Sequence, residues 1–223
     1  MSGLENVLLL RHGETVGQSG ARYWGATDVP LSVIGRMQMR LAAPLVAKYR
    51  VRCVYTSSLS RTREAAALVA PNVPSVALAA FDEVHFGHWE GLTREEIASA
   101  YPEEYLQWER RPADFSYPGG ESLLEFRARV EAGLAHVLSD PGPSVLVIAH
   151  RGVIRWALSH LLEENTRAIR ELEIALGSLH LLHRGTDGRW VAHLLDFTDH
   201  LSEMTDENSP PDTRSLLPPM SKR

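Results

Sequence analysis

Three short apolar runs constrain the fold of this chain more than any other feature of its sequence. Each run leads directly into basic or hydroxyl-bearing residues. The runs are Val7–Leu10 before Arg11-His12-Gly13, Val51–Tyr55 before Thr56-Ser57-Ser58, and Ser144–Ala149 before His150-Arg151-Gly152. Runs with so little polar alternation are typical of strands covered on both faces. They predict a largely parallel sheet.

Helical patterns lie between and after these runs. Residues 32–49 place Val33, Met37, Leu41 and Leu45 four residues apart, and an alanine-rich segment over 60–70 ends at Pro71. Two four-residue segments, 93–96 and 122–125, match the capping box that begins a helix. The second opens a stripe through Phe126, Val130, Leu134 and Val137, and residues 152–162 form a further amphipathic segment.

The C-terminal third adds a different pairing. Leu179–His183 and Trp190–Asp196 flank a glycine-containing turn and predict an antiparallel hairpin. Strands alternating with helices indicate an α/β domain with three layers, α/β/α, and a mostly parallel central sheet that ends in an antiparallel strand. Residues 202–223 are rich in proline and polar residues without periodicity, so we expect a flexible C-terminal tail there.

Composition excludes several classes of protein. The chain of 223 residues has 44% hydrophobic residues, which is enough to bury a core without disulfides. Its one cysteine, Cys53, cannot form an internal bridge and is expected to be buried in a strand. The net charge of −5, with no basic block, argues against nucleic acid as a partner. With no apolar stretch long enough for a signal segment or a membrane span, we expect no membrane association and a cytoplasmic location.

Basic and hydroxyl side chains at the strand ends suggest an anion site. Carboxyl ends of parallel strands meet at one edge of an open α/β sheet, where ligands bind. Two imidazoles and several guanidiniums would gather there, and a phosphoryl group matches guanidinium geometry. An anionic substrate of this acidic chain would need such a local cationic pocket.

Six ordered motifs then carry a resemblance to a known family. The chain resembles the histidine phosphatase superfamily, also called phosphoglycerate mutase-like, over residues 4–201, with a cap insertion at about 84–120. An RHG tripeptide alone would be weak support, whereas six blocks in the expected order are specific. The blocks are residues 10–15 (LRHGET), 24–32 (WGATDVPLS), 56–61 (TSSLSR), 82–91 (DEVHFGHWEG), 118–122 (PGGES) and 149–155 (AHRGVIR).

The resemblance implies a role for each matching residue. His12 would be the nucleophile that forms a phosphohistidine, while Arg11, Arg61 and His150 would hold the phosphate oxygens. Glu83 would protonate the leaving oxygen and then activate water. Cations of the protein would supply the charge that phosphoryl transfer needs, so no metal and no cofactor are expected.

Several residues compete for these roles. Arg63 is the alternative to Arg61, while Asp82 and Glu90 are the alternatives to Glu83. Four other histidines (His85, His88, His180 and His183) do not match a metal-binding spacing, and surface or packing roles are expected for them.

Substrate contacts are predicted less directly. Gln18, Trp24, Gly25 and Arg151 are expected to bind the substrate; Gln18 stands where the family usually has Asn, and Arg151 where it usually has a small residue. Trp24, Trp89 and Trp108 either line the pocket or belong to the core. Residues 101–111 form either a lid helix over the site or a solvated surface helix.

The expected reaction is hydrolysis of a small phosphorylated metabolite. Val84-His85-Phe86-Gly87 replaces the R-H-Y-G of phosphoglycerate mutases, and their long basic segment is missing. The motifs most resemble α-ribazole phosphatase-like enzymes, a branch that merges into broad-specificity sugar-phosphate phosphatases. Mutase-type phosphoryl transfer, a phosphoprotein substrate and a non-catalytic phospholigand-binding relative stay open as alternatives. The oligomeric state is also open, a homodimer included.

Overall fold

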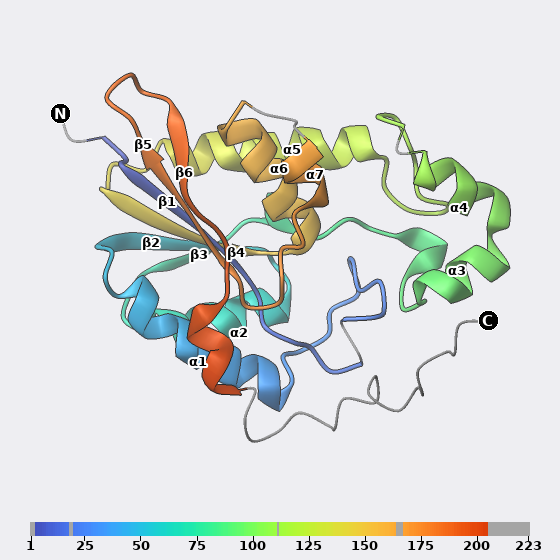
Figure 1. Ribbon diagram of the computed structural model, residues 1–223, viewed down its shortest axis with the longest axis horizontal. Coiled ribbons are helices and arrows are strands. Elements are labelled where there is room, and N and C mark those ends of the chain that lie inside the picture. Colours follow the sequence, from blue (N-terminus) through green and yellow to red (C-terminus); the bar gives the residue numbers. More distant parts are fainter. Residues whose placement is uncertain (1–2, 18–19, 111, 164–166, 205–223) are drawn as a thin grey trace, which may run out of the picture.

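The protein is built on one six-stranded sheet, seen in a computed structural model that describes residues 3–17, 20–110, 112–163 and 167–204 (Figure 1). The strand order is β3-β2-β4-β1-β5-β6. The first four of these pair in parallel, β5 pairs antiparallel with β1, and β6 pairs antiparallel with β5. Their bounds are β1 Asn6–Arg11, β2 Val51–Thr56, β3 Ser75–Ala77, β4 Ser144–Ala149, β5 Leu179–Arg184 and β6 Trp190–Phe197. The mostly parallel sheet with an antiparallel C-terminal end is therefore confirmed.

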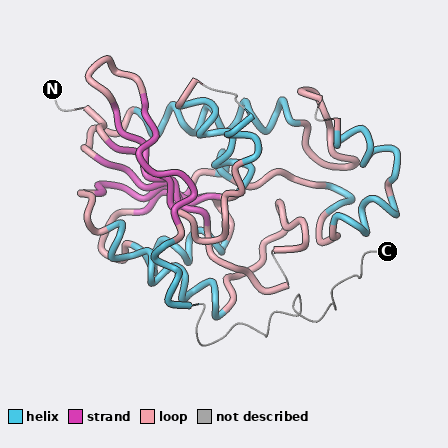
Figure 2. Tube along the Cα trace, in the orientation of Figure 1, coloured by secondary structure: helices cyan, strands magenta, loops and turns pink. Residues whose placement is uncertain are grey.

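Helices cover both faces of this sheet (Figure 2). Along β1, Leu8 and Leu10 pack toward α1 and α2, whereas Val7 and Leu9 pack toward α5 and α6, because successive residues of a strand point to opposite faces. The bounds are α1 Val33–Val46, α2 Ser60–Val69, α5 Leu123–Leu138, α6 Arg151–Leu161 and α7 Arg167–Glu171. Burial on both faces explains why the central strands are almost entirely apolar, and it confirms the three-layer prediction.

Helix α1 corrects one expectation. The predicted stripe of Val33, Met37, Leu41 and Leu45 is not the buried face, since Val33 is 71% exposed. The residues buried in α1 are instead Gly35, Met39, Ala42 and Val46. Gly35 allows this phase because the helix lies so close to the loop after β1 that a Cβ on Gly35 would meet the Glu14 carbonyl oxygen at 1.9 Å. The close packing of the α1 backbone at Gly35 against Glu14, and not the size of the side chains, determines which face of α1 is buried.

The segment between β3 and α5, where the sequence predicts a cap, is partly helical. It contains η2 Gly87–Trp89, α3 Arg94–Ala100 and α4 Pro102–Glu109, and α3 and α4 lie at the end of the molecule away from the β5–β6 hairpin (Figure 1). Trp89 is fully buried and makes edge-to-face ring contacts with Trp108 and Tyr117. Both predicted capping boxes, at Thr93 and Ser122, are present.

Five elements were not predicted: β3, the turns η1, η2 and η3, and the short helix α7. Strand β3 is a short edge strand whose residues are all exposed, so no apolar run marks it. The turns η1 (Ala79–Phe81) and η3 (Asp199–Met204) are also additional. Residues 205–223 of the expected tail lie outside the described residues. None of the helices in the described ranges is long and apolar enough to cross a bilayer.

Candidate active site

The carboxyl ends of β1, β2 and β4 bring the predicted residues together. The rings of His12 and His150 lie 5.0 Å apart, centroid to centroid, and the Arg61 Nε donates to His150 Nδ1 at 3.2 Å. Each residue follows a different strand, and β4 lies between β1 and β2. The sheet topology therefore assembles the site from distant parts of the sequence, because Arg11 pairs with Ala149 directly before His12 and His150.

His12 presents one free ring nitrogen. Its Nδ1 lies 2.7 Å from the carbonyl oxygen of Gly13, and a carbonyl can only accept, so Nδ1 carries the hydrogen. Burial, followed by the charges of Arg61 and Arg11, holds the pKa of His12 well below 6.5. The ring is therefore neutral at pH 7, and Nε2 carries the lone pair.

Arg61 is fixed by backbone carbonyls. It is 1% exposed, and its guanidinium donates to the carbonyl oxygens of Gly25 at 2.7 Å and Thr27 at 2.9 Å, and to that of Trp24 at 3.4 Å. Burial lowers the pKa of Arg61. The loop over residues 24–27 thus fixes the direction of the guanidinium before any ligand binds.

Arg11 is held by a backbone carbonyl of the segment before β5. Its Nη1 donates to the Ile174 carbonyl oxygen at 2.7 Å, and its buried Nε has no hydrogen-bond partner among the described residues. Burial and then Arg151 lower the pKa of Arg11 to about 10, so the group stays charged at pH 7. Ile174 adopts a φ of +54°, a rare conformation for a β-branched residue. This strained residue and its carbonyl were not anticipated from the sequence.

His150 is oriented by a hydroxyl network. Because Nδ1 accepts from Arg61, Nε2 carries the hydrogen and donates to the Ser57 Oγ at 2.9 Å. Ser57 in turn contacts the Thr62 hydroxyl at 2.8 Å. Burial and Arg61 hold the pKa of His150 well below 6.5. The serine cluster after β2 was visible in the sequence, but its role as a support for His150 was not.

The Glu83 side chain lies against the N-terminus of α6, the helix that follows His150. It is 7% exposed, and its carboxylate accepts from the backbone N–H of Gly152 at 2.9 Å and of Val84 at 3.1 Å. A Cβ on Gly152 would meet the Glu83 Oε1 at 2.5 Å, so this approach requires glycine.

The two carboxylates that competed with Glu83 shape loops instead. Asp82 accepts from the backbone N–H of Ser58 at 2.7 Å and from its hydroxyl. Glu90 accepts from the backbone N–H groups of Gly25, Ala26 and Thr27 at 3.0–3.3 Å. Glu90 therefore holds the loop whose carbonyls bind Arg61, which is a role that the sequence did not reveal.

The remaining predicted residues differ in their placement. Gly25 contributes its backbone to Arg61, and Trp24 donates from its indole to the Gly17 carbonyl oxygen at 2.8 Å. Arg151 is an exposed first residue of α6. Gln18 lies outside the described residues. Arg63, the alternative to Arg61, is exposed to solvent.

The four other histidines do not gather into a metal site in the described part of the chain. His180 is buried with Nδ1 accepting from the Asp196 backbone N–H at 3.1 Å, while His85, His88 and His183 are exposed. Over the described ranges, no group of three or more His, Cys, Asp or Glu side chains could hold a metal ion.

The electrostatics of the site suit an anion. Neither Arg11 nor Arg61 forms an ion pair within 4.0 Å in the described part of the chain. Two guanidiniums with a neutral imidazole between strand ends provide donors that match the oxygens of a phosphoryl group.

Comparisons with known proteins agree with this geometry. The chain is 31% identical to 2,3-bisphosphoglycerate-dependent phosphoglycerate mutase 2 of Gloeobacter violaceus, over 75% of this chain and 80% of that one. It is 28% identical to phosphoserine phosphatase 1 of Hydrogenobacter thermophilus, over 88% and 94%. The alpha-ribazole phosphatase from Shigella flexneri shares the fold, with a TM-score of 0.77, 22% identity and coverage of 86% and 96%.

A family model settles which group of proteins these similarities define. The model of the histidine phosphatase superfamily (branch 1) matches residues 7–197, which include every predicted catalytic residue. The chain therefore belongs to the histidine phosphatase superfamily and is an enzyme of the histidine phosphatase type.

Proposed function

We propose that this enzyme is a metal-independent phosphomonoester hydrolase that works through a phosphohistidine on His12. The observation that carries this proposal is the state of the His12 ring, which is buried, neutral and hydrogen-bonded through Nδ1 to Gly13. That arrangement leaves the Nε2 lone pair available as a nucleophile between the Arg11 and Arg61 guanidiniums.

In the first step, Nε2 of His12 attacks phosphorus and the bond from phosphorus to the ester oxygen breaks. Glu83 gives its proton to the departing oxygen. The positive ring that results is stabilised by the Nδ1–H bond to the Gly13 carbonyl oxygen. Arg11, Arg61 and His150 bind the equatorial oxygens, whose charge dominates the energetics of phosphoryl transfer.

In the second step, water attacks the phosphorus of the phosphohistidine. The Glu83 carboxylate takes a proton from that water, and the electrons of the N–P bond return to the imidazole. Inorganic phosphate leaves and Glu83 is again protonated for the next turnover. Both steps use the same two residues.

The proposed substrate is a small phosphorylated metabolite, such as α-ribazole phosphate or a sugar phosphate. Trp24, Gly25, Gln18 and Arg151 are proposed to contact its leaving group. Relatives named as a phosphoserine phosphatase and as a phosphoglycerate mutase support small phosphorylated molecules as a class. Such a substrate and a single cysteine, buried in β2, fit a cytoplasmic enzyme.

Mutase-type transfer is the second candidate function, because the 31%-identical relative is named as a mutase. The two reactions share the phosphohistidine and differ in whether water or a second hydroxyl receives the phosphoryl group. Incubation with 3-phosphoglycerate and a bisphosphoglycerate primer distinguishes them. Release of inorganic phosphate supports hydrolysis, whereas formation of 2-phosphoglycerate without phosphate release supports the mutase.

The decisive experiment is hydrolysis of p-nitrophenyl phosphate in excess EDTA, with wild type beside His12→Ala. We expect wild-type turnover to survive the chelator and the variant to lose about 10³-fold or more, as for removal of other covalent nucleophiles. His160→Ala, an exposed change in α6, is the matched control and should keep full activity. Unchanged turnover in His12→Ala would refute the proposal.

A further inference from the structure

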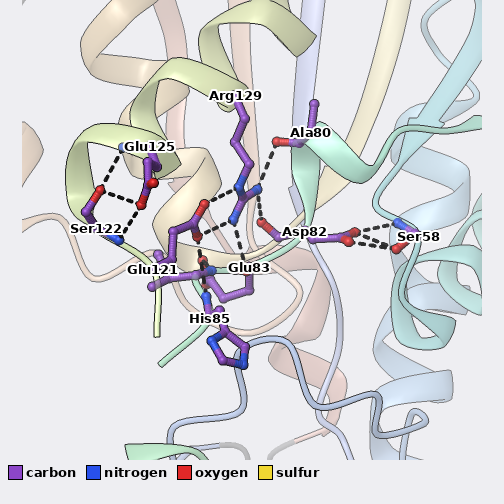
Figure 3. A network of polar contacts seen from close by, with 10 residues as sticks. Ser58, Ala80, Asp82, Glu83, His85, Glu121, Ser122, Glu125 and Arg129 are labelled. Atoms are coloured by element: carbon purple, nitrogen blue, oxygen red, sulfur yellow. Dashed lines mark hydrogen bonds and ion pairs between the residues drawn. The ribbon is translucent and has the colours of Figure 1, made fainter. Parts of the chain in front are cut away.

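Arg129 of α5 uses its whole guanidinium to hold the segment that carries Glu83 (Figure 3). Nη1 donates to the carbonyl oxygens of Ala80 at 3.1 Å and Asp82 at 2.6 Å, and Nη2 donates to that of Glu83 at 3.1 Å. The fork also pairs with Glu121 through Nε at 2.6 Å and Nη2 at 2.8 Å. A guanidinium has five N–H donors, so all of them are occupied.

Glu121 fixes the same segment from its other end. Its backbone N–H donates to the His85 carbonyl oxygen at 2.9 Å, and its carboxylate accepts from the His85 N–H at 3.4 Å. Residues 83–86 belong to no helix or strand, so no regular ladder bonds the backbone around Glu83. Arg129 and Glu121 supply the partners that a neighbouring strand would otherwise provide.

The same network reaches the phosphate side of the site. Asp82, whose carbonyl binds Arg129, uses its carboxylate to hold Ser58, which begins the turn into α2 and Arg61 (Figure 3). The position of Glu83 relative to Arg61 therefore depends on this chain of contacts. In the described part of the chain, Arg129 donates hydrogen bonds to Glu121 and to backbone carbonyl oxygens, and none of these bonds goes to His12, Arg61 or His150.

We propose that Arg129, braced by Glu121, is a positioning residue that places the Glu83 carboxyl for proton transfer to the leaving oxygen. This inference rests on the proposed function. Proton transfer needs donor and acceptor within about 2.6–3.2 Å, so a small displacement of the Glu83 backbone removes it. We expect phosphoryl attack by His12 to be retained, because Arg61 is also held by the carbonyl oxygens of Gly25 and Thr27, and Arg11 by that of Ile174.

Replacement of Arg129 should lower kcat/KM by an amount that depends on the leaving group of the substrate. Esters of acidic alcohols, such as p-nitrophenyl phosphate, release a stable anion and need little protonation. Esters of ordinary alcohols, such as glycerol phosphate, need a proton from Glu83. We therefore expect Arg129→Met to lower kcat/KM by about 30–100-fold for glycerol phosphate and by less than about threefold for p-nitrophenyl phosphate.

The experiment measures kcat/KM over p-nitrophenyl, phenyl and glycerol phosphates, because kcat/KM reports steps up to loss of the leaving group. Glu83→Gln serves as the reference and should fall steeply as the leaving oxygen becomes more basic. Arg127→Met is the matched control, since Arg127 lies on the same helix with its guanidinium over the Trp156 ring. It should retain the shallow wild-type dependence.

The outcomes distinguish failure of the proposed role of Arg129 from failure of the proposed function. An equal loss on all three esters, or a dependence as shallow as that of wild type, would overturn the role of Arg129. A shallow dependence in Glu83→Gln would instead overturn the proposed function. Should Arg129→Met not fold, Arg129→Lys replaces it, because a lysine keeps the cation but cannot serve Glu121 and the three carbonyls together. Its dependence should then be intermediate.

Discussion

Replacing Gly25 by Ala is predicted to disable the phosphate site without touching any side chain in it. Gly25 is buried, its carbonyl accepts from Arg61 at 2.7 Å and its N–H donates to Glu90 at 3.1 Å. A Cβ at this position would meet the Val84 carbonyl oxygen at 1.9 Å and the Glu90 Oε1 at 2.4 Å. Neither partner can move freely, since Val84 adjoins Glu83 and Glu90 binds three successive N–H groups.

The magnitude follows from the size of the overlap. The new carbon is about 1.5 Å short of ordinary van der Waals contact, so the loop or the Glu83 segment must shift by about 1 Å in a close-packed interior. A displacement of about 1 Å in a site can reduce activity about 10²-fold. Overpacking of this kind costs about 1–3 kcal/mol of unfolding free energy. We expect kcat/KM to fall about 10²-fold in a variant that still folds.

The assay is steady-state hydrolysis of p-nitrophenyl phosphate together with thermal unfolding. Gly20→Ala, in the same connection between β1 and α1, is the matched control, because a Cβ at Gly20 meets no atom of the described residues within 4 Å. It should leave both activity and stability unchanged. A Gly25→Ala variant whose kcat/KM stays within twofold of wild type would refute the argument that this loop positions Arg61.

Two further predictions concern the buried rings. Because burial holds the pKa of His12 and His150 well below 6.5 and lowers that of His180 to about 4, these rings stay neutral in the native state while the unfolded chain binds protons near pH 6.5. The free energy of unfolding should then be constant above about pH 7. Below pH 6.5 it should fall by up to about 1.4 kcal/mol per pH unit for each ring. Equal free energies of unfolding at pH 7.5 and pH 5, measured by urea denaturation, would contradict this. Ser57→Ala removes the acceptor of the His150 Nε2–H, so we expect about a tenfold loss of kcat/KM, corresponding to about 1.4 kcal/mol. Ser139→Ala, at an exposed position, is the control. Equal kcat/KM values of the two variants would contradict the role of Ser57.

The sheet and the gathering of basic residues could be predicted because their signals are local. A strand covered on both faces produces an unbroken apolar run, and β4 matches its predicted bounds Ser144–Ala149. The capping box at Ser122 is likewise contained in four residues. The catalytic roles of His12 and Glu83 stay predictions.

The features that were not predicted depend on contacts with residues far away in the sequence. Glu90 binds the backbone of Gly25 from 65 residues away, and no local pattern separates it from a surface carboxylate. The phase of α1 depends on how closely Gly35 approaches Glu14. Strand β3 pairs with β2 through backbone groups alone, so its exposed side chains carry no strand pattern.

The strand order has a consequence for the synthesis of this protein on the ribosome. Strands β1 and β2 do not pair with each other, and both wait for β4, which inserts between them. At about 5–20 residues per second, β4 emerges about 4–18 seconds after β2, and until then the buried residues of both strands lack their central partner. His12 and Arg61 cannot meet His150 during this interval. The nascent chain therefore holds an unfinished sheet without a phosphate site, which makes it dependent on protection from aggregation until the last parallel strand arrives.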